Sequence, residues 1–136
     1  MVKLPKNAVA ALHKQALVAA AHAYAPYSNI HVGAALLAND GNIYTGCNVE
    51  NASYGLTVCA ERNAIANALI QITQNRATLI QAMYVVSDKL GAMPPCGACH
   101  QVISEFGKGG WIFFRTEKSI KKLKIAALLP EAFNLN

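Results

Sequence analysis

The sequence predicts an α/β fold in which helices cover a sheet of mixed strand direction, and two observations carry this prediction. Helical and strand patterns alternate along the second half of the chain, as they do where crossover helices join parallel strands. Earlier, the dipeptide Asp40-Gly41 separates two strand-like segments and is typical of a tight antiparallel turn. The chain has 136 residues, enough for one compact core, and we expect a single domain over residues 1–136.

The first half is expected to contain a helix and then a hairpin. Over residues 8–24 apolar side chains recur at steps of three and four, and Pro26 would end that helix. Strand patterns follow at residues 31–39 and 43–48, on either side of the tight turn.

A second helix and a third strand come next. Residues 51–56 are expected to form a loop, and Thr57 is a suitable N-cap for a helix over residues 58–72. The many alanines of that helix would let it pack closely on a sheet. Residues 79–87 are mostly apolar, which predicts a buried strand.

The remaining elements complete the alternation. A loop is expected at Pro94-Pro95, a third helix over residues 96–107 and a fourth strand over residues 110–115. The tail predicts a short strand at 120–123 and a helical turn that ends at Pro130.

Composition excludes several classes of protein. Apolar residues make up 54% of the chain and charged residues 14%, which excludes intrinsic disorder. No apolar run approaches the ~20 residues of a membrane helix, and the N-terminal segment lacks the apolar stretch of an export signal. We therefore expect no membrane partner and a cytoplasmic location, where cysteines stay reduced. The net charge is +5, but the lysines between Lys118 and Lys124 lack interleaved aromatics and favour a solvated edge or helix face over a nucleic-acid site.

Three cysteines and one glutamate form the pattern that carries chemistry. Cys59 lies near the start of the second helix, and Cys96 and Cys99 lie three apart at the start of the third. Helix N-termini stabilise thiolates, which are the metal-binding form of cysteine. Three thiolates without a fourth protein ligand are typical of a catalytic zinc site, because the open position takes water. Glu61 could then move protons between that water and a substrate. We expect one Zn²⁺ per chain.

Several further motifs occur in an order shared with one family. They are Tyr24-Ala25-Pro26-Tyr27-Ser28, Val32-Gly33-Ala34-Ala35-Leu36, Asn48-Val49-Glu50-Asn51-Ala52-Ser53-Tyr54, Cys59-Ala60-Glu61-Arg62, Pro95-Cys96-Gly97-Ala98-Cys99 and Leu128-Leu129-Pro130 followed by Phe133. With these motifs, over nearly its whole length, the chain resembles the small zinc-dependent cytidine deaminases that act on free nucleosides.

The resemblance implies a three-layer α/β/α fold around a five-stranded mixed sheet, assembled as a homotetramer. It implies a hydrolase of pyrimidine salvage that converts cytidine and deoxycytidine to uridine and deoxyuridine and releases ammonia. Residues matching Asn48 and Glu50 hydrogen-bond the ribose 3′-hydroxyl in that family, and an amide and a carboxylate two apart on an extended segment do face the same side. The other substrate-binding positions that it implies are Ile30, Ala60 and, reaching a neighbouring subunit's site, Ala52, Tyr54 and Phe133.

Two departures from the family pattern concern the surroundings of the site. Arg62 is the expected positive partner of the thiolates, but His100 stands where the family commonly has a second arginine. Because histidine is mostly neutral near pH 7, we expect less permanent positive charge near the metal. Ile30 replaces a phenylalanine, which keeps an apolar wall but removes a ring for stacking.

Three alternatives remain open. Another small cytosine-containing molecule could be the substrate, since blasticidin deaminases share the zinc motifs and size. A polynucleotide cytosine deaminase is a weaker alternative, because the chain has one tryptophan and no added domain for a strand-binding groove. A zinc module without activity is disfavoured by the presence of Glu61.

Overall fold

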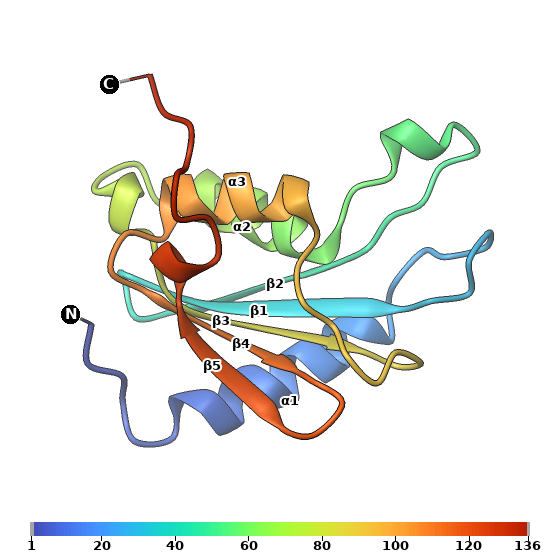
Figure 1. The fold of residues 1–136 in the computed structure, drawn as a ribbon, viewed down its shortest axis with the longest axis horizontal. Helices are drawn as coiled ribbons and strands as arrows, with labels where there is room; N and C mark the ends of the chain where they lie inside the picture. The colour runs from blue at the N-terminus through green and yellow to red at the C-terminus, as the bar shows by residue number, and fades with distance from the viewer. Residues whose placement is uncertain (1, 136) are drawn as a thin grey trace.

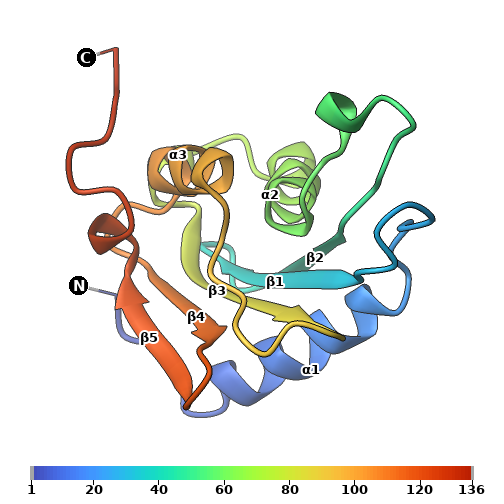
Figure 2. The ribbon, with the colours of Figure 1, turned by 45° about the vertical axis from the view of Figure 1, so that its right-hand side comes forward.

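The computed structural model describes residues 2–135, which form a three-layer structure around a five-stranded sheet (Figures 1 and 2). The strand order is β2-β1-β3-β4-β5, and only β3 and β4 of the adjacent pairs are parallel. The mixed α/β prediction is therefore confirmed. The elements are α1 Ala8–Ala20, β1 Val32–Ala38, β2 Ile43–Cys47, η1 Tyr54–Leu56, α2 Ala60–Gln71, η2 Arg76–Thr78, β3 Ile80–Ser87, α3 Gly97–Phe106, β4 Trp111–Arg115, β5 Ile120–Lys124 and η3 Ile125–Ala127.

One face of the sheet is covered by α1 alone (Figure 2). Leu12 and Ala16 of this helix are fully buried against a cluster that includes Tyr84 and Phe113 of the sheet. The helix lies very close to β1 because Gly33 has no side chain: a Cβ there would lie 2.6 Å from the backbone nitrogen of Ala20. Small residues thus set the spacing of this layer.

The opposite face carries α2 and α3 side by side, above the larger core. Ala60, Ala64 and Ala68 line the buried side of α2, as expected of the alanine-rich segment. They approach β2 at Gly46, where a Cβ would lie 2.5 Å from the Ala60 carbonyl oxygen. This close packing fixes the start of α2 relative to the sheet.

The lysines of β5 lie on an edge strand, which is one of the two placements that the sequence allowed. Lys121, Lys122 and Lys124 are all exposed, and the ammonium of Lys122 lies 4.2 Å from the Trp111 ring centre. Charged side chains on an edge strand discourage pairing with other sheets. None of the helices within residues 2–135 is long and apolar enough to cross a membrane.

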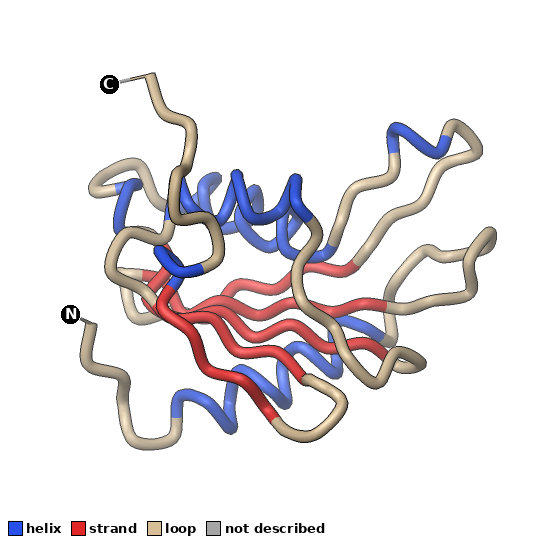
Figure 3. The backbone as a smooth tube through the Cα atoms, in the orientation of Figure 1, coloured by secondary structure: helices blue, strands red, loops and turns tan. Residues whose placement is uncertain are grey.

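Two helix boundaries differ from the sequence-based expectation. The first helix ends at Ala20 rather than Tyr24, because Tyr24 pairs with the segment after β2: its N–H donates to the Asn48 carbonyl at 3.0 Å, and its carbonyl accepts from Glu50 at 2.8 Å. The expected loop at 51–56 also contains the short helix η1, as the tube in Figure 3 shows.

The second helix begins later than expected, and Thr57 is not its N-cap. Val58 forms an antiparallel bridge with Val49, and the backbone N–H of each residue donates to the carbonyl of the other at 3.0 Å. The Thr57 hydroxyl instead accepts the Asn51 N–H at 3.3 Å. The N-cap position passes to Cys59, which has an extended backbone. The thiol is consequently placed at the very start of the helix.

Candidate metal centre

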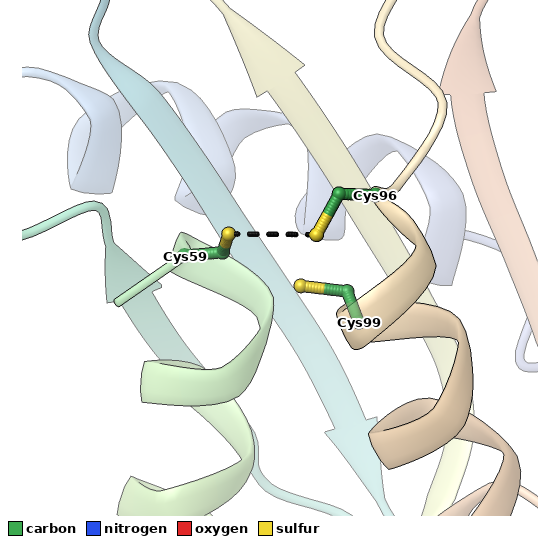
Figure 4. Close-up of side chains that lie close together, drawn as sticks. All are labelled: Cys59, Cys96 and Cys99. Carbon is green, nitrogen blue, oxygen red and sulfur yellow. Dashed lines mark hydrogen bonds between the residues drawn. The ribbon is translucent and has the colours of Figure 1, made fainter. Parts of the chain in front are cut away.

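Three cysteine side chains converge where α2 and α3 begin (Figure 4). Cys59 and Cys96 occupy the N-cap positions of the two helices, and Cys99 lies in the first turn of α3. The Sγ atoms of Cys59 and Cys96 are 3.7 Å apart, and all three sulfurs lie within 4.8 Å of one another. This is the only group of three potential metal-binding side chains among the described residues 2–135.

The electrostatics of the cluster favour one thiolate, on Cys59. A hydrogen bond from Cys99, together with Arg62, lowers the pKa of the Cys59 thiol to about 5. The same hydrogen bond and burial raise the pKa of the Cys99 thiol. Both helix N-termini add positive partial charge at the sulfurs. The cluster thus carries negative charge near neutral pH and offers soft donors for a cation such as Zn²⁺.

Arg62 contacts the thiol cluster, and His100 follows Cys99 directly in α3. An Nη atom of Arg62 donates to the Cys59 sulfur at 3.4 Å. Within residues 2–135, Nε of Arg62 and Nε2 of His100 are the two buried side-chain nitrogen or oxygen atoms without a hydrogen-bond partner. One permanent positive charge therefore contacts the thiol cluster directly.

Glu61 is buried beside the thiols of Cys59 and Cys99. It is only 1% exposed, on the first turn of α2, one residue after the buried Ala60. Burial raises the pKa of its carboxyl to about 7, and the negative charge of Cys59 adds to the rise. A carboxyl with this pKa can both take up and release a proton near neutral pH.

Asn48 and Glu50 lie beside the start of α2. The residue between them, Val49, forms the bridge that leads directly into Cys59. Asn48 is buried, and its amide accepts from the Val32 N–H and donates to the Ile30 carbonyl, both at 2.8 Å. The predicted pair is therefore brought to the same end of the sheet as the thiols.

Glu50 is held by a turn that the sequence analysis did not assign to the site. Its Oε1 accepts the N–H groups of Tyr27 at 2.9 Å and Ser28 at 3.1 Å, and its Oε2 accepts the Ser28 hydroxyl at 2.5 Å. The Ser28 hydroxyl, followed by the two N–H groups, lowers the pKa of Glu50 below its usual range. No composition or spacing signal marks backbone N–H donors, so only the motif that includes Tyr27-Ser28 could have pointed here.

The remaining predicted residues fall into two groups. Ile30 is half-buried and packs on the core cluster that includes Ala60 and Cys99. Ala52, Tyr54 and Phe133 are exposed, the last two at 75% and 71%, on segments that stand away from the sheet (Figures 1 and 3). The structure does not bring these three to the thiols of their own chain.

Comparison with known proteins agrees with this geometry. Residues 6–115 match the model of the cytidine and deoxycytidylate deaminase zinc-binding region. The chain belongs to this family. A cytidine deaminase of Sporosarcina psychrophila is 46% identical over 114 residues, covering 82% of this chain and 81% of that protein. A cytidine deaminase of Halalkalibacterium halodurans is 43% identical over 124 residues, covering 90% and 91%.

Solved structures of the family share the fold. The crystal structure of cytidine deaminase from Burkholderia pseudomallei superposes with a TM-score of 0.82 at 45% identity, covering 91% of this chain and 98% of that one. The expected three-layer arrangement is thereby confirmed. A blasticidin-S deaminase of Bacillus cereus is more distant, at 27% identity over 110 residues, covering 78% of this chain and 79% of that protein.

Proposed function

We propose that this protein catalyses the hydrolytic deamination of cytidine and deoxycytidine to uridine and deoxyuridine, with release of ammonia. The observation that carries the proposal is the convergence of three thiols at two helix starts, with the buried carboxyl of Glu61 beside them. The names of the relatives support the same reaction.

Cys59, Cys96 and Cys99 would hold one Zn²⁺. Three mutually close sulfurs with a guanidinium donating to one of them suit a thiolate-bound cation. The zinc would supply Lewis-acid chemistry, lowering the pKa of a bound water near the substrate. Since the protein offers three ligands, a fourth position would stay open for that water.

Glu61 would move the protons of the reaction. Its carboxyl takes a proton from the attacking water and donates one to N3 of cytosine, which makes C4 more electrophilic. Glu61 then takes the remaining proton from the hydroxyl added at C4 and gives it to the amine as the C4–N bond breaks, so that C4 becomes a carbonyl and the amine leaves as ammonia. Burial makes both protonation states accessible near neutral pH, since it raises the pKa of Glu61 to about 7.

The nucleoside would bind between the metal centre and residues 48–50. Asn48 and Glu50 would bind the ribose 3′-hydroxyl, while Ile30 and Ala60 would line the base. Ala52, Tyr54 and Phe133 would complete the site of a neighbouring subunit in a homotetramer. Their exposure on projecting segments supports this role, because exposed aromatic side chains are typical of protein interfaces. Three reduced thiols also favour a cytoplasmic location.

The test of the proton-transfer role is Glu61→Gln, which keeps the shape of the side chain but cannot accept a proton. We expect the turnover number for cytidine to fall by about 10²–10⁴-fold, with zinc content unchanged. Glu105→Gln, on the exposed side of α3, is the matched control and should keep wild-type turnover. Normal turnover in Glu61→Gln would show that another group moves the protons.

A second candidate substrate is blasticidin S, favoured by the distant relative of that name. Parallel assays with cytidine, deoxycytidine and blasticidin S separate the two. If kcat/KM is larger for blasticidin S than for either nucleoside, blasticidin S is the substrate. The proposed roles of the three thiols and of Glu61 would be unchanged.

A further inference from the structure

The turn at residues 27–28 surrounds one carboxylate with donors. Two backbone N–H groups, from Tyr27 and Ser28, point at Oε1 of Glu50, and the Ser28 hydroxyl donates to Oε2. All three donors come from residues more than twenty positions away in the chain, so the folded structure alone brings them together. Charge-assisted hydrogen bonds of this kind fix both the orientation and the ionisation of a carboxylate.

The carboxylate of Glu50 keeps one acceptor position that these three donors do not fill. A carboxylate oxygen accepts about two hydrogen bonds. Oε1 of Glu50 already accepts two, and Oε2 accepts one. One acceptor position on Oε2 is left, and Glu50 lines a surface pocket of about 340 Å³ together with Tyr27, Ser28, Tyr54 and Thr57. The pocket therefore offers one fixed anionic acceptor, which suits a single hydroxyl donor.

The same serine also reaches the other polar residue of the pair. Ser28 Oγ accepts the Ile30 N–H at 3.0 Å, and the Ile30 carbonyl accepts from the Asn48 amide at 2.8 Å. Since Oγ accepts from Ile30, its own proton is directed to Glu50. Ser28 thus ties the orientation of Glu50 to the segment that orients Asn48.

We propose that Ser28 is a positioning residue for recognition of the sugar 3′-hydroxyl: its hydroxyl aims the remaining acceptor position of Glu50 at that group. The inference rests on the proposed nucleoside site and adds to it a residue that does not touch the reacting atoms. It predicts an effect that depends on the 3′-hydroxyl of the ligand rather than on the base.

The test compares Ser28→Ala, Ser28→Thr and wild-type protein with 2′-deoxycytidine and 2′,3′-dideoxycytidine, which differ only in the 3′-hydroxyl. In Ser28→Ala we expect kcat/KM for deoxycytidine to fall about tenfold, mainly through KM, and kcat/KM for dideoxycytidine to change less than about twofold. Ser28→Thr keeps the hydroxyl and should restore most of the preference. Ser119→Ala, in the distant β4–β5 turn, is the matched control, because only backbone atoms of Ser119 take part in the hydrogen bonds of that turn.

Calorimetric binding of 2′-deoxyuridine and 2′,3′-dideoxyuridine to the same proteins gives a readout that does not require turnover. Loss of the preference for the 3′-hydroxyl in Ser28→Ala, with recovery in Ser28→Thr, supports the proposal. An equal fall for both ligands overturns it, since Ser28 would then only support the local fold. If wild-type protein binds both deoxyuridines but deaminates neither cytidine analogue, the proposed reaction fails while the binding comparison still decides on Ser28. No binding to wild type overturns the inference.

Discussion

Because α2 approaches the sheet closely at Gly46, a side chain at this position would displace the part of α2 that carries the metal centre. In Gly46→Ala the new Cβ would lie 2.5 Å from the Ala60 carbonyl oxygen and 2.8 Å from the Asn63 carbonyl carbon. Its contact with the backbone nitrogen of Ala64 would be shorter than either of these. Ordinary contact begins at 3.4 Å, so the first turn of α2 must move by more than about 0.9 Å. All three neighbours are helix backbone, which cannot rotate away.

The consequence for the site follows from what that turn carries. Cys59 caps α2 and Glu61 lies in its first turn, whereas Cys96 and Cys99 belong to α3. Metal–ligand distances tolerate only about ±0.2 Å, so a displacement of this size opens the thiol cluster. We expect zinc affinity to fall at least about tenfold and kcat/KM by about 10²-fold. The overpacking should also lower the free energy of unfolding by about 1–3 kcal/mol.

Gly33→Ala is the matched control, because it creates the same kind of clash with α1 on the opposite face. Its Cβ would lie 2.6 Å from the backbone nitrogen of Ala20, and its distance to the Ala16 carbonyl oxygen would be shorter still. We expect a comparable loss of stability in urea unfolding, but zinc affinity within about threefold of wild type in a chelator competition assay. Equal zinc loss in both variants, or none in Gly46→Ala, would refute the reasoning.

Three further predictions follow from individual contacts. Arg62→Ala removes the donor to the Cys59 sulfur and should weaken zinc about 10–100-fold in chelator competition, whereas an unchanged affinity would exclude that role. Stripping the zinc with excess chelator should lower Tm by at least about 4 °C in calorimetry, reversibly on re-addition of Zn²⁺; an unchanged Tm would argue against a metal in the folded protein. The His31 backbone N–H and ring lower the pKa of Asp88 from 3.8, so this carboxylate stabilises the fold above about pH 4 and that contribution is lost as pH falls through the lowered pKa. Asp88→Asn should therefore flatten the dependence of Tm on pH below about 4, and an unchanged slope would contradict the assignment.

The metal centre could be predicted from the sequence because its geometry is local. Cys96 and Cys99 are three residues apart at a helix start, and Glu61 is two residues after Cys59. Helical periodicity converts such spacings into positions with little help from the rest of the fold. Cys59 lies 37 residues before Cys96, so the approach of the two helix starts depends on the fold, which the sequence indicated through its resemblance to the family.

The predicted end of the first helix and the predicted N-cap of the second were wrong because distant segments of the chain determine the local structure there. Tyr24 has helix-compatible neighbours, but it pairs with the chain after β2, and this ends α1 four residues early. Thr57 is a good N-cap by residue type, yet the bridge of Val58 to Val49 moves the cap to Cys59. The contact of Ser28 with Glu50 depends on the same kind of tertiary approach, so it could not be derived from periodicity.

The most direct test of the account measures zinc content and cytidine deamination on one preparation of purified protein. We expect about one zinc per chain, conversion of cytidine to uridine with equimolar ammonia, and loss of both zinc and activity in Cys99→Ala. Rapid deamination by protein freed of zinc, or in Cys99→Ala without bound metal, would contradict the central claim that the three thiols hold the catalytic cation.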